Sequence, residues 1–92
     1  MNEFRFNEDE CIQDLLEYIK STYNSHYALS SDDVQPNDLI ISNGDGEAFF
    51  RSNVIKYVSR MNKKGTPKKD LLKAMHYCVL LYNIVNKNDE TI

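Results

Sequence analysis

Apolar residues recur at helical spacing along most of this chain. The first such pattern begins after Asn7, a favourable N-cap residue, and Glu10 three residues later completes a capping-box pattern. The apolar positions that follow share one helical face: Ile12, Leu15, Leu16, Ile19 and Tyr23. The pattern predicts a helix from about Asn7 to Tyr23 or Asn24, with this face buried.

A short helix is the favoured interpretation of the next apolar segment. It opens at Gln35-Pro36, and its apolar residues are Leu39, Ile40 and Ile41. The sequence Asn43-Gly-Asp-Gly46 then gives a strong turn signal. A short strand over residues 38–42 remains an alternative, because a brief apolar run does not distinguish the two.

A third helix is predicted from its cap at Asp45 to about Asn62. Its apolar stripe consists of Phe50, Val54, Tyr57, Val58 and Met61. Gly65 ends this pattern, and Thr66-Pro67 starts the next helix, with Thr66 as N-cap and Pro67 in the first helical position. This fourth helix is expected to reach about Asn86. Its predicted core face is Leu71, Met75, Cys78, Val79 and Tyr82, with Ala74, Leu81 and Val85 beside it.

These patterns predict an all-α protein with three main helices and one short helix. The short connection from Lys63 to Thr66 makes the third and fourth helices an antiparallel pair. A length of 92 residues predicts one domain, residues 1–92, with a frayed tail over 87–92. Because so short a chain buries only a modest core, we expect a homo-oligomer.

The chain shows no targeting or membrane signal. No apolar run approaches the roughly 20 residues of a membrane span, and the start of the chain is acidic rather than basic and apolar. We therefore expect a cytoplasmic protein. Cys11 and Cys78 are expected to be small buried apolar residues, and together with His26 and His76 they lack the spacing of a zinc site.

Charge is divided sharply along the sequence. Residues 51–73 hold eight of the eleven basic residues and one acid, whereas residues 1–50 hold eleven acids and two basic residues. The basic segment predicts an anionic partner. The net charge of −3 and the pI near 5.2 argue against nonspecific binding of long nucleic acid.

Two polar strips are candidates for a phosphate site. Asn53, Lys56 and Arg60 share one flank of the third helix, and Asp70, Lys73 and Tyr77 form a strip on the fourth. In an antiparallel pair these strips can face each other, which would gather the cations around one volume suited to phosphate. Tyr27, Tyr57 or Tyr77 could stack on a base. The alternative is a solvated basic face with an Asp70–Lys73 ion pair along the helix.

Other residues are candidates for supporting roles. His26 and Tyr27 form either part of a pocket wall or an ordinary loop. Lys63, Lys64, Lys68 and Lys69 cluster at the helix connection, where we expect them to be exposed. These four lysines could attract anions or bind an acidic host protein. The phosphate-loop signature of many nucleotide-binding proteins is missing from the sequence.

The sequence from about residue 25 to residue 82 resembles the SaV-like family of small phage proteins of unknown function. The matching positions are His26-Tyr27, Asn53, Lys56-Tyr57, Arg60, Lys63-Lys64, Asp70-Leu71, Lys73-Ala74 and Tyr77. One position departs from the pattern, since Ser52 stands where the family usually has Gly. The first helix lies outside this resemblance.

The family includes a coliphage nucleotide kinase without a phosphate loop, so the resemblance implies a nucleotide-handling protein. A nucleoside monophosphate kinase would use ATP and Mg²⁺, with Asp70 as general base or metal ligand. A second hypothesis is an oligomeric, non-catalytic protein that sequesters nucleotides, including the cyclic nucleotides of anti-phage defence. The sequence does not decide between an enzyme and a binding protein.

Overall fold

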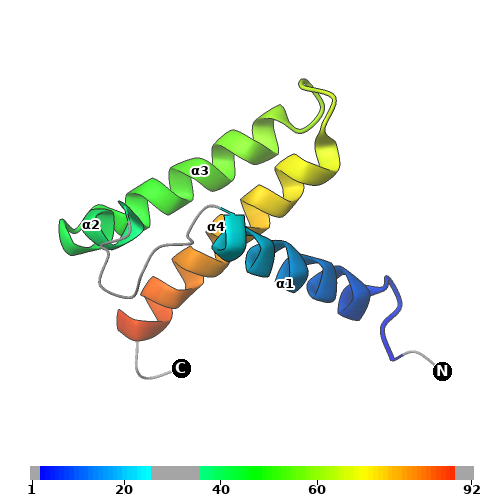
Figure 1. The fold of residues 1–92 in the computed structure, drawn as a ribbon, viewed down its shortest axis with the longest axis horizontal. Helices are drawn as coiled ribbons and strands as arrows, with labels where there is room; N and C mark the ends of the chain where they lie inside the picture. Colours follow the sequence, from blue (N-terminus) through cyan, green and yellow to red (C-terminus); the bar gives the residue numbers. More distant parts are fainter. Residues whose placement is uncertain (1–2, 26–35, 89–92) are drawn as a thin grey trace. The chain divides into compact units, whose positions relative to one another are not determined.

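The computed structural model describes residues 3–25 and 36–88. The chain divides into two compact units, Met1–Ser31 and Asp32–Ile92, which we describe separately. The described residues form four helices and no strand: α1 (Glu8–Ser25), α2 (Pro36–Ser42), α3 (Gly46–Arg60) and α4 (Pro67–Asn88) (Figure 1). The predicted all-α class is confirmed, while the single domain stays a prediction.

Helix α1 is the described helix of the first unit. The Cys11 N–H donates to the Asn7 carbonyl at 2.9 Å, so Asn7 lies at the start of the helix as predicted. Asn7 has a positive φ of 57°. At this start of the helix the Phe6 N–H donates a hydrogen bond to the Glu8 side chain, at Oε1, over 2.7 Å. The local sequence is rich in acids, and Glu8 supplies this contact instead of the predicted Glu10.

The predicted buried face of α1 is only partly covered. Leu15 and Ile19 are half-buried. Ile12, Leu16 and Tyr23 are exposed, against the prediction.

Helix α2 confirms the short helix and shows the strand alternative to be wrong. Its end is closed by the Gly44 N–H, which donates to the Ile41 carbonyl at 3.0 Å, and by the Asp45 N–H, which donates to the Ile40 carbonyl at 3.1 Å. Gly44 has φ of +85°, a conformation that costs glycine little because it has no Cβ. This tight turn leads directly into α3.

Helices α3 and α4 form the predicted antiparallel hairpin (Figure 1). At the end of α3 the Lys63 N–H donates to the Arg60 carbonyl at 2.8 Å, and Gly65 takes φ of +74° to reverse the chain. Helix α4 starts at Pro67 as predicted, and the Asp70 N–H donates to the Thr66 carbonyl at 3.0 Å. It extends to Asn88, so the predicted tail begins later than expected, and residues 89–92 lie outside the described residues.

The interior of the hairpin is small. Phe50 is completely buried and Ala74 is 3% exposed. Gly46 lies so close to both neighbouring helices that a Cβ there would be 2.8 Å from Ile84 Cδ1 and 3.0 Å from Ile41 Cγ1. Glycine at this position therefore allows α2 and α4 to approach the start of α3.

The predicted core face of α4 is wrong. All five residues that were expected to be buried are exposed: Leu71, Met75, Cys78, Val79 and Tyr82. The face toward α3 instead carries Asp70, Ala74, Tyr77, Leu81 and Ile84, which are buried or half-buried. Helix α4 is apolar on two faces, and the small Ala74 permits close approach of α3 on this one.

Two smaller expectations are also wrong. Val58, which was assigned to the core stripe of α3, is 47% exposed. Cys11 and Cys78 are free and exposed rather than buried. Cys78 is exposed because it belongs to the face of α4 that α3 does not cover.

Candidate phosphate site between helices α3 and α4

A buried ion pair joins the two helices next to their connection. Arg60 Nε donates to Asp70 Oδ1 at 3.0 Å, and Thr66 Oγ1 donates to the other carboxylate oxygen, Oδ2, at 3.4 Å. The Asp70 side chain is completely buried, whereas that of Arg60 is 33% exposed. The ion pair predicted as an alternative, Asp70 with Lys73, is therefore replaced by a pair across the hairpin.

Two tyrosines stack between the helices one turn further along. The rings of Tyr57 and Tyr77 are nearly parallel, with an interplanar angle of 9° and centroids 5.9 Å apart. Tyr77 also meets Phe49 edge-to-face at 6.3 Å and Phe50 at 6.1 Å. Offset stacking and edge-to-face contacts of this kind stabilise aromatic clusters beyond the area they bury.

Three cations converge on the Tyr57 ring. Arg60 Cζ lies 4.8 Å from the ring centroid, Lys73 Nζ 5.2 Å and Lys56 Nζ 5.3 Å. Lys56 and Arg60 come from α3, whereas Lys73 comes from α4. We call these three residues the basic cluster; they form it because antiparallel packing turns the two predicted polar strips toward each other.

The electrostatics of the basic cluster favour an anion. Each cation gains from the negative face of the aromatic ring, but three like charges near one ring also repel each other. Among the described residues, Asp70 is the carboxylate paired with the cluster, and its contact is with Arg60. A phosphate group would neutralise the remaining positive charge, with Arg60 as a planar donor and the lysines as mobile point charges.

The remaining predicted site residues are placed differently. Asn53 is half-buried, and its Nδ2 donates to the Phe49 carbonyl at 2.9 Å within α3, which uses one of the N–H groups of the amide. His26 and Tyr27 lie outside the described residues. Lys63, Lys64, Lys68 and Lys69 are exposed at the helix connection, as expected.

Two contributors to the site were not predicted. Phe49 supports Tyr77, and Thr66 contacts Asp70 in addition to preceding α4. The i, i+4 spacing of Thr66 and Asp70 at a helix start could have indicated the second contact. The role of Phe49 depends on the angle at which α3 and α4 pack, which the sequence pattern does not give.

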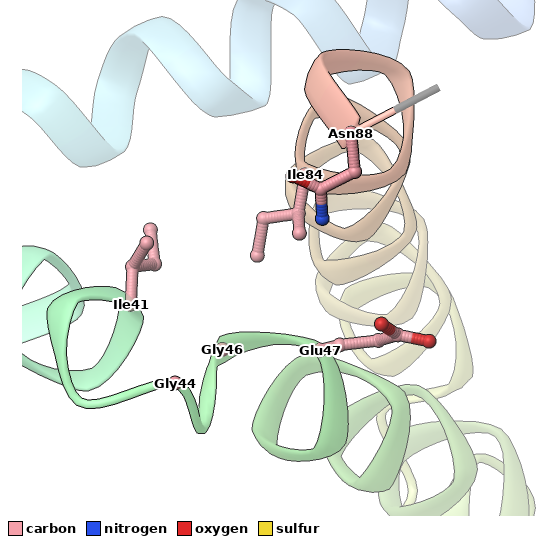
Figure 2. Close-up of a pocket in the computed structure, with 6 residues that line it drawn as sticks. All are labelled: Ile41, Gly44, Gly46, Glu47, Ile84 and Asn88. Atoms are coloured by element: carbon pink, nitrogen blue, oxygen red, sulfur yellow. The ribbon is translucent and has the colours of Figure 1, made fainter.

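A separate pocket lies at the opposite end of the hairpin. Its volume is about 210 Å³, and Figure 2 shows the residues around it: Ile41, Gly44, Gly46, Glu47, Ile84 and Asn88. This lining contains the carboxylate of Glu47 and no cation. Its chemistry does not suit phosphate, so the candidate phosphate site is the basic cluster.

His76 is a titratable residue whose environment alters its pKa. It is 8% exposed, and burial lowers its pKa below the usual value of 6.5, because a buried imidazole is harder to protonate. Within residues 3–25 and 36–88, no three His, Cys, Asp or Glu side chains are placed to hold a metal ion together. None of the helices in this described part is long and apolar enough to cross a membrane.

Comparison with known proteins places this chain in a family. Residues 13–79 match the family described as a protein of unknown function, DUF3310, and the chain belongs to that family. The match begins within α1 and includes most of that helix. Neither the curated proteins nor the solved structures provide a significant match.

Proposed function

We propose that this protein binds the phosphate of a nucleotide at the basic cluster. The observation that carries this proposal is the convergence of Lys56, Arg60 and Lys73 within 4.8–5.3 Å of the Tyr57 ring centroid. Lys56 and Lys73 take part in no ion pair with another described residue, so both are available to a ligand. Phosphate is the anion best suited to several cations held around one point.

The resemblance to the SaV-like phage proteins supports a nucleotide as the source of the phosphate. On this proposal the protein is phage-encoded and acts as a nucleoside monophosphate kinase, with ATP and Mg²⁺ as co-substrate and metal ion. Phosphoryl transfer depends mainly on positioning and on neutralising charge, and a cluster of cations supplies both.

A non-catalytic sponge for nucleotides, including cyclic ones, is the second candidate. This candidate is favoured by the state of the carboxylate at the site. Asp70 is completely buried, and both of its oxygens already accept hydrogen bonds. Such a site supplies positive charge and aromatic surface but little acid–base chemistry, which is enough for sequestration.

The test is calorimetry with a panel of mono-, tri- and cyclic nucleotides. We would compare the wild type with Lys56→Ala/Lys73→Ala, which removes two cations of the cluster and leaves the Arg60–Asp70 pair intact. The matched control is Lys63→Ala/Lys64→Ala, which removes the same charge from the exposed connection. We expect the first variant to lose at least roughly 10-fold in affinity and the control less than about 3-fold.

The outcomes separate the candidates. Equal losses in both double variants would show general attraction of anions rather than a site. No binding by the wild type would end the nucleotide proposal and favour an acidic protein as partner. Where a nucleotide binds, incubation with ATP and Mg²⁺ followed by chromatography distinguishes a kinase, which converts it, from a sponge, which releases it unchanged.

We also propose that the protein is a homo-oligomer. The support is the exposed apolar face of α4, on which Leu71, Val79 and Tyr82 are 37%, 43% and 62% exposed. Apolar faces of this kind are typical of interfaces. Light scattering should give a mass above that of one chain, and Val79→Gln should lower it; a monomeric wild type would contradict the proposal.

A further inference from the structure

Asp70 combines complete burial with a position beside the basic cluster. Its carboxylate has 0% exposure, and both oxygens are occupied: Oδ1 by Arg60 Nε at 3.0 Å and Oδ2 by Thr66 Oγ1 at 3.4 Å. A general base or a metal ligand needs an oxygen that the substrate or the ion can reach. The geometry of Asp70 meets this requirement poorly.

The contact with Arg60 leaves most of the guanidinium group available. Arg60 uses Nε toward Asp70, and the guanidinium group carries further N–H donors on its two terminal nitrogens. Its side chain is 33% exposed, and Cζ lies 4.8 Å from the Tyr57 centroid. The group is thus held from one side by a carboxylate and placed over a ring that is itself stacked on Tyr77.

We propose that Asp70 is a positioning residue that fixes the Arg60 guanidinium so that its terminal N–H groups face the phosphate bound at the basic cluster. This inference rests on the proposed nucleotide function and names the part that Asp70 plays in it. Thr66 completes the arrangement, because its hydroxyl hydrogen bond holds the second carboxylate oxygen. Arg60 is the fixed donor of the cluster, and Lys56 and Lys73 are its mobile charges.

Stability alone gives a weak reason for such a pair. Taking a carboxylate out of water is costly, and well-packed apolar residues usually stabilise a helix hairpin at least as well as a buried ion pair does. A positioning role gives a direct reason, since an arginine held in one orientation loses less conformational entropy when it binds a ligand.

The first experiment asks whether Asp70→Asn raises or lowers the affinity for the nucleotide. Asp70→Asn removes one negative charge next to an anion site, so simple electrostatics predicts tighter nucleotide binding. The positioning role predicts the opposite: a loss of roughly 10-fold, because Arg60 loses its charged partner. The control is Asp38→Asn on α2, an exposed residue, which removes the same charge and should leave the affinity unchanged.

The probe is the nucleotide that binds the wild type most tightly. An unchanged or increased affinity of Asp70→Asn overturns the inference. So does loss of turnover at unchanged affinity, which would make Asp70 a catalytic base or metal ligand. If the wild type binds no nucleotide at all, the proposed function itself is refuted. This result differs from a failure of the positioning role alone, in which the wild type still binds.

NMR of the arginine side chains tests the wild type directly and does not depend on whether Asp70→Asn folds. The inference requires the Arg60 Nε–H signal to be protected from solvent exchange before and after nucleotide is added. It also requires the terminal N–H signals of Arg60 to shift on titration. Loss of Nε–H protection on binding, or terminal signals that do not move while nucleotide binds, would overturn it.

Discussion

The two faces of α4 differ in burial, and the difference is the opposite of what the apolar pattern of the sequence predicts. The face toward α3 carries a charged residue, Asp70, together with Ala74 and Tyr77, and it is buried or half-buried. The outer face carries large apolar residues, and Val79 and Tyr82 on it are 43% and 62% exposed. A more hydrophobic face is therefore not automatically the one that packs within the hairpin.

Close helix packing and the hydrogen bonds of the buried carboxylate explain why this face of α4 packs against α3. Ala74 lets α3 approach closely, and Asp70 is acceptable in the interior because Arg60 and Thr66 satisfy its oxygens. The outer face stays apolar and exposed, and we propose that it contacts another copy of the chain. The inner face thus carries the candidate site, and the outer face carries the proposed assembly.

The largest expected effect comes from breaking the ion pair of the inner face. Arg60→Met leaves the completely buried Asp70 carboxylate without its cation, and we expect the free energy of unfolding to fall by about 3 kcal/mol. Asp70→Asn should cost less, because Arg60 is 33% exposed and can be hydrated. Urea denaturation followed by circular dichroism measures both.

The control for this experiment is the double variant Arg60→Met/Asp70→Leu, which replaces the pair with apolar residues. It should recover most of the stability lost in Arg60→Met. If Arg60→Met costs no more than Asp70→Asn, the buried carboxylate does not depend on Arg60 as described.

Adjacent residues on opposite faces sharpen the comparison. Ala74 is 3% exposed and Met75 is 36% exposed. Ala74→Leu should destabilise the protein by about 2 kcal/mol through overpacking against α3, whereas Met75→Leu should change stability by less than about 0.5 kcal/mol. Similar effects in thermal denaturation at low protein concentration would show that the two faces are equally covered.

Gly46→Ala tests the far end of the inner face. The added Cβ would lie 2.8 Å from Ile84 Cδ1 and 3.0 Å from Ile41 Cγ1. We expect a net loss of about 1 kcal/mol, because crowding outweighs the better helix propensity of alanine. In the Gly46→Ala background, Ile84→Val should cost less than it does alone, because it removes the crowded Cδ1; simple additivity would argue against this contact.

The smallest effect is a pH dependence from His76. Burial lowers its pKa in the folded state, so below about pH 6.5 the unfolded chain binds a proton more readily than the folded one. Its contribution to stability is therefore complete above pH 6.5 and declines as the pH falls toward the folded-state pKa. We expect a change below about 1 kcal/mol, and His76→Gln should flatten this part of the stability profile; an unchanged profile would assign it to other groups.

The sequence by itself determined the helices and their connections. Pro36, the Gly44–Gly46 turn and the Gly65-Thr66-Pro67 junction impose local backbone conformations, and local conformation is what sequence patterns predict well. The short connection also fixed the antiparallel order of α3 and α4, which makes it possible for Lys56, Arg60 and Lys73 to meet around Tyr57.

Only the tertiary structure decided which face of α4 is inside and which partner Asp70 takes. Helix α4 is apolar on two sides, so periodicity alone could not choose between them. The choice depends on close approach at Ala74 and on satisfying one buried carboxylate, both of which are properties of two helices together. An ion pair between Arg60 and Asp70 follows from that packing and could not be read from helical spacing along α4 alone.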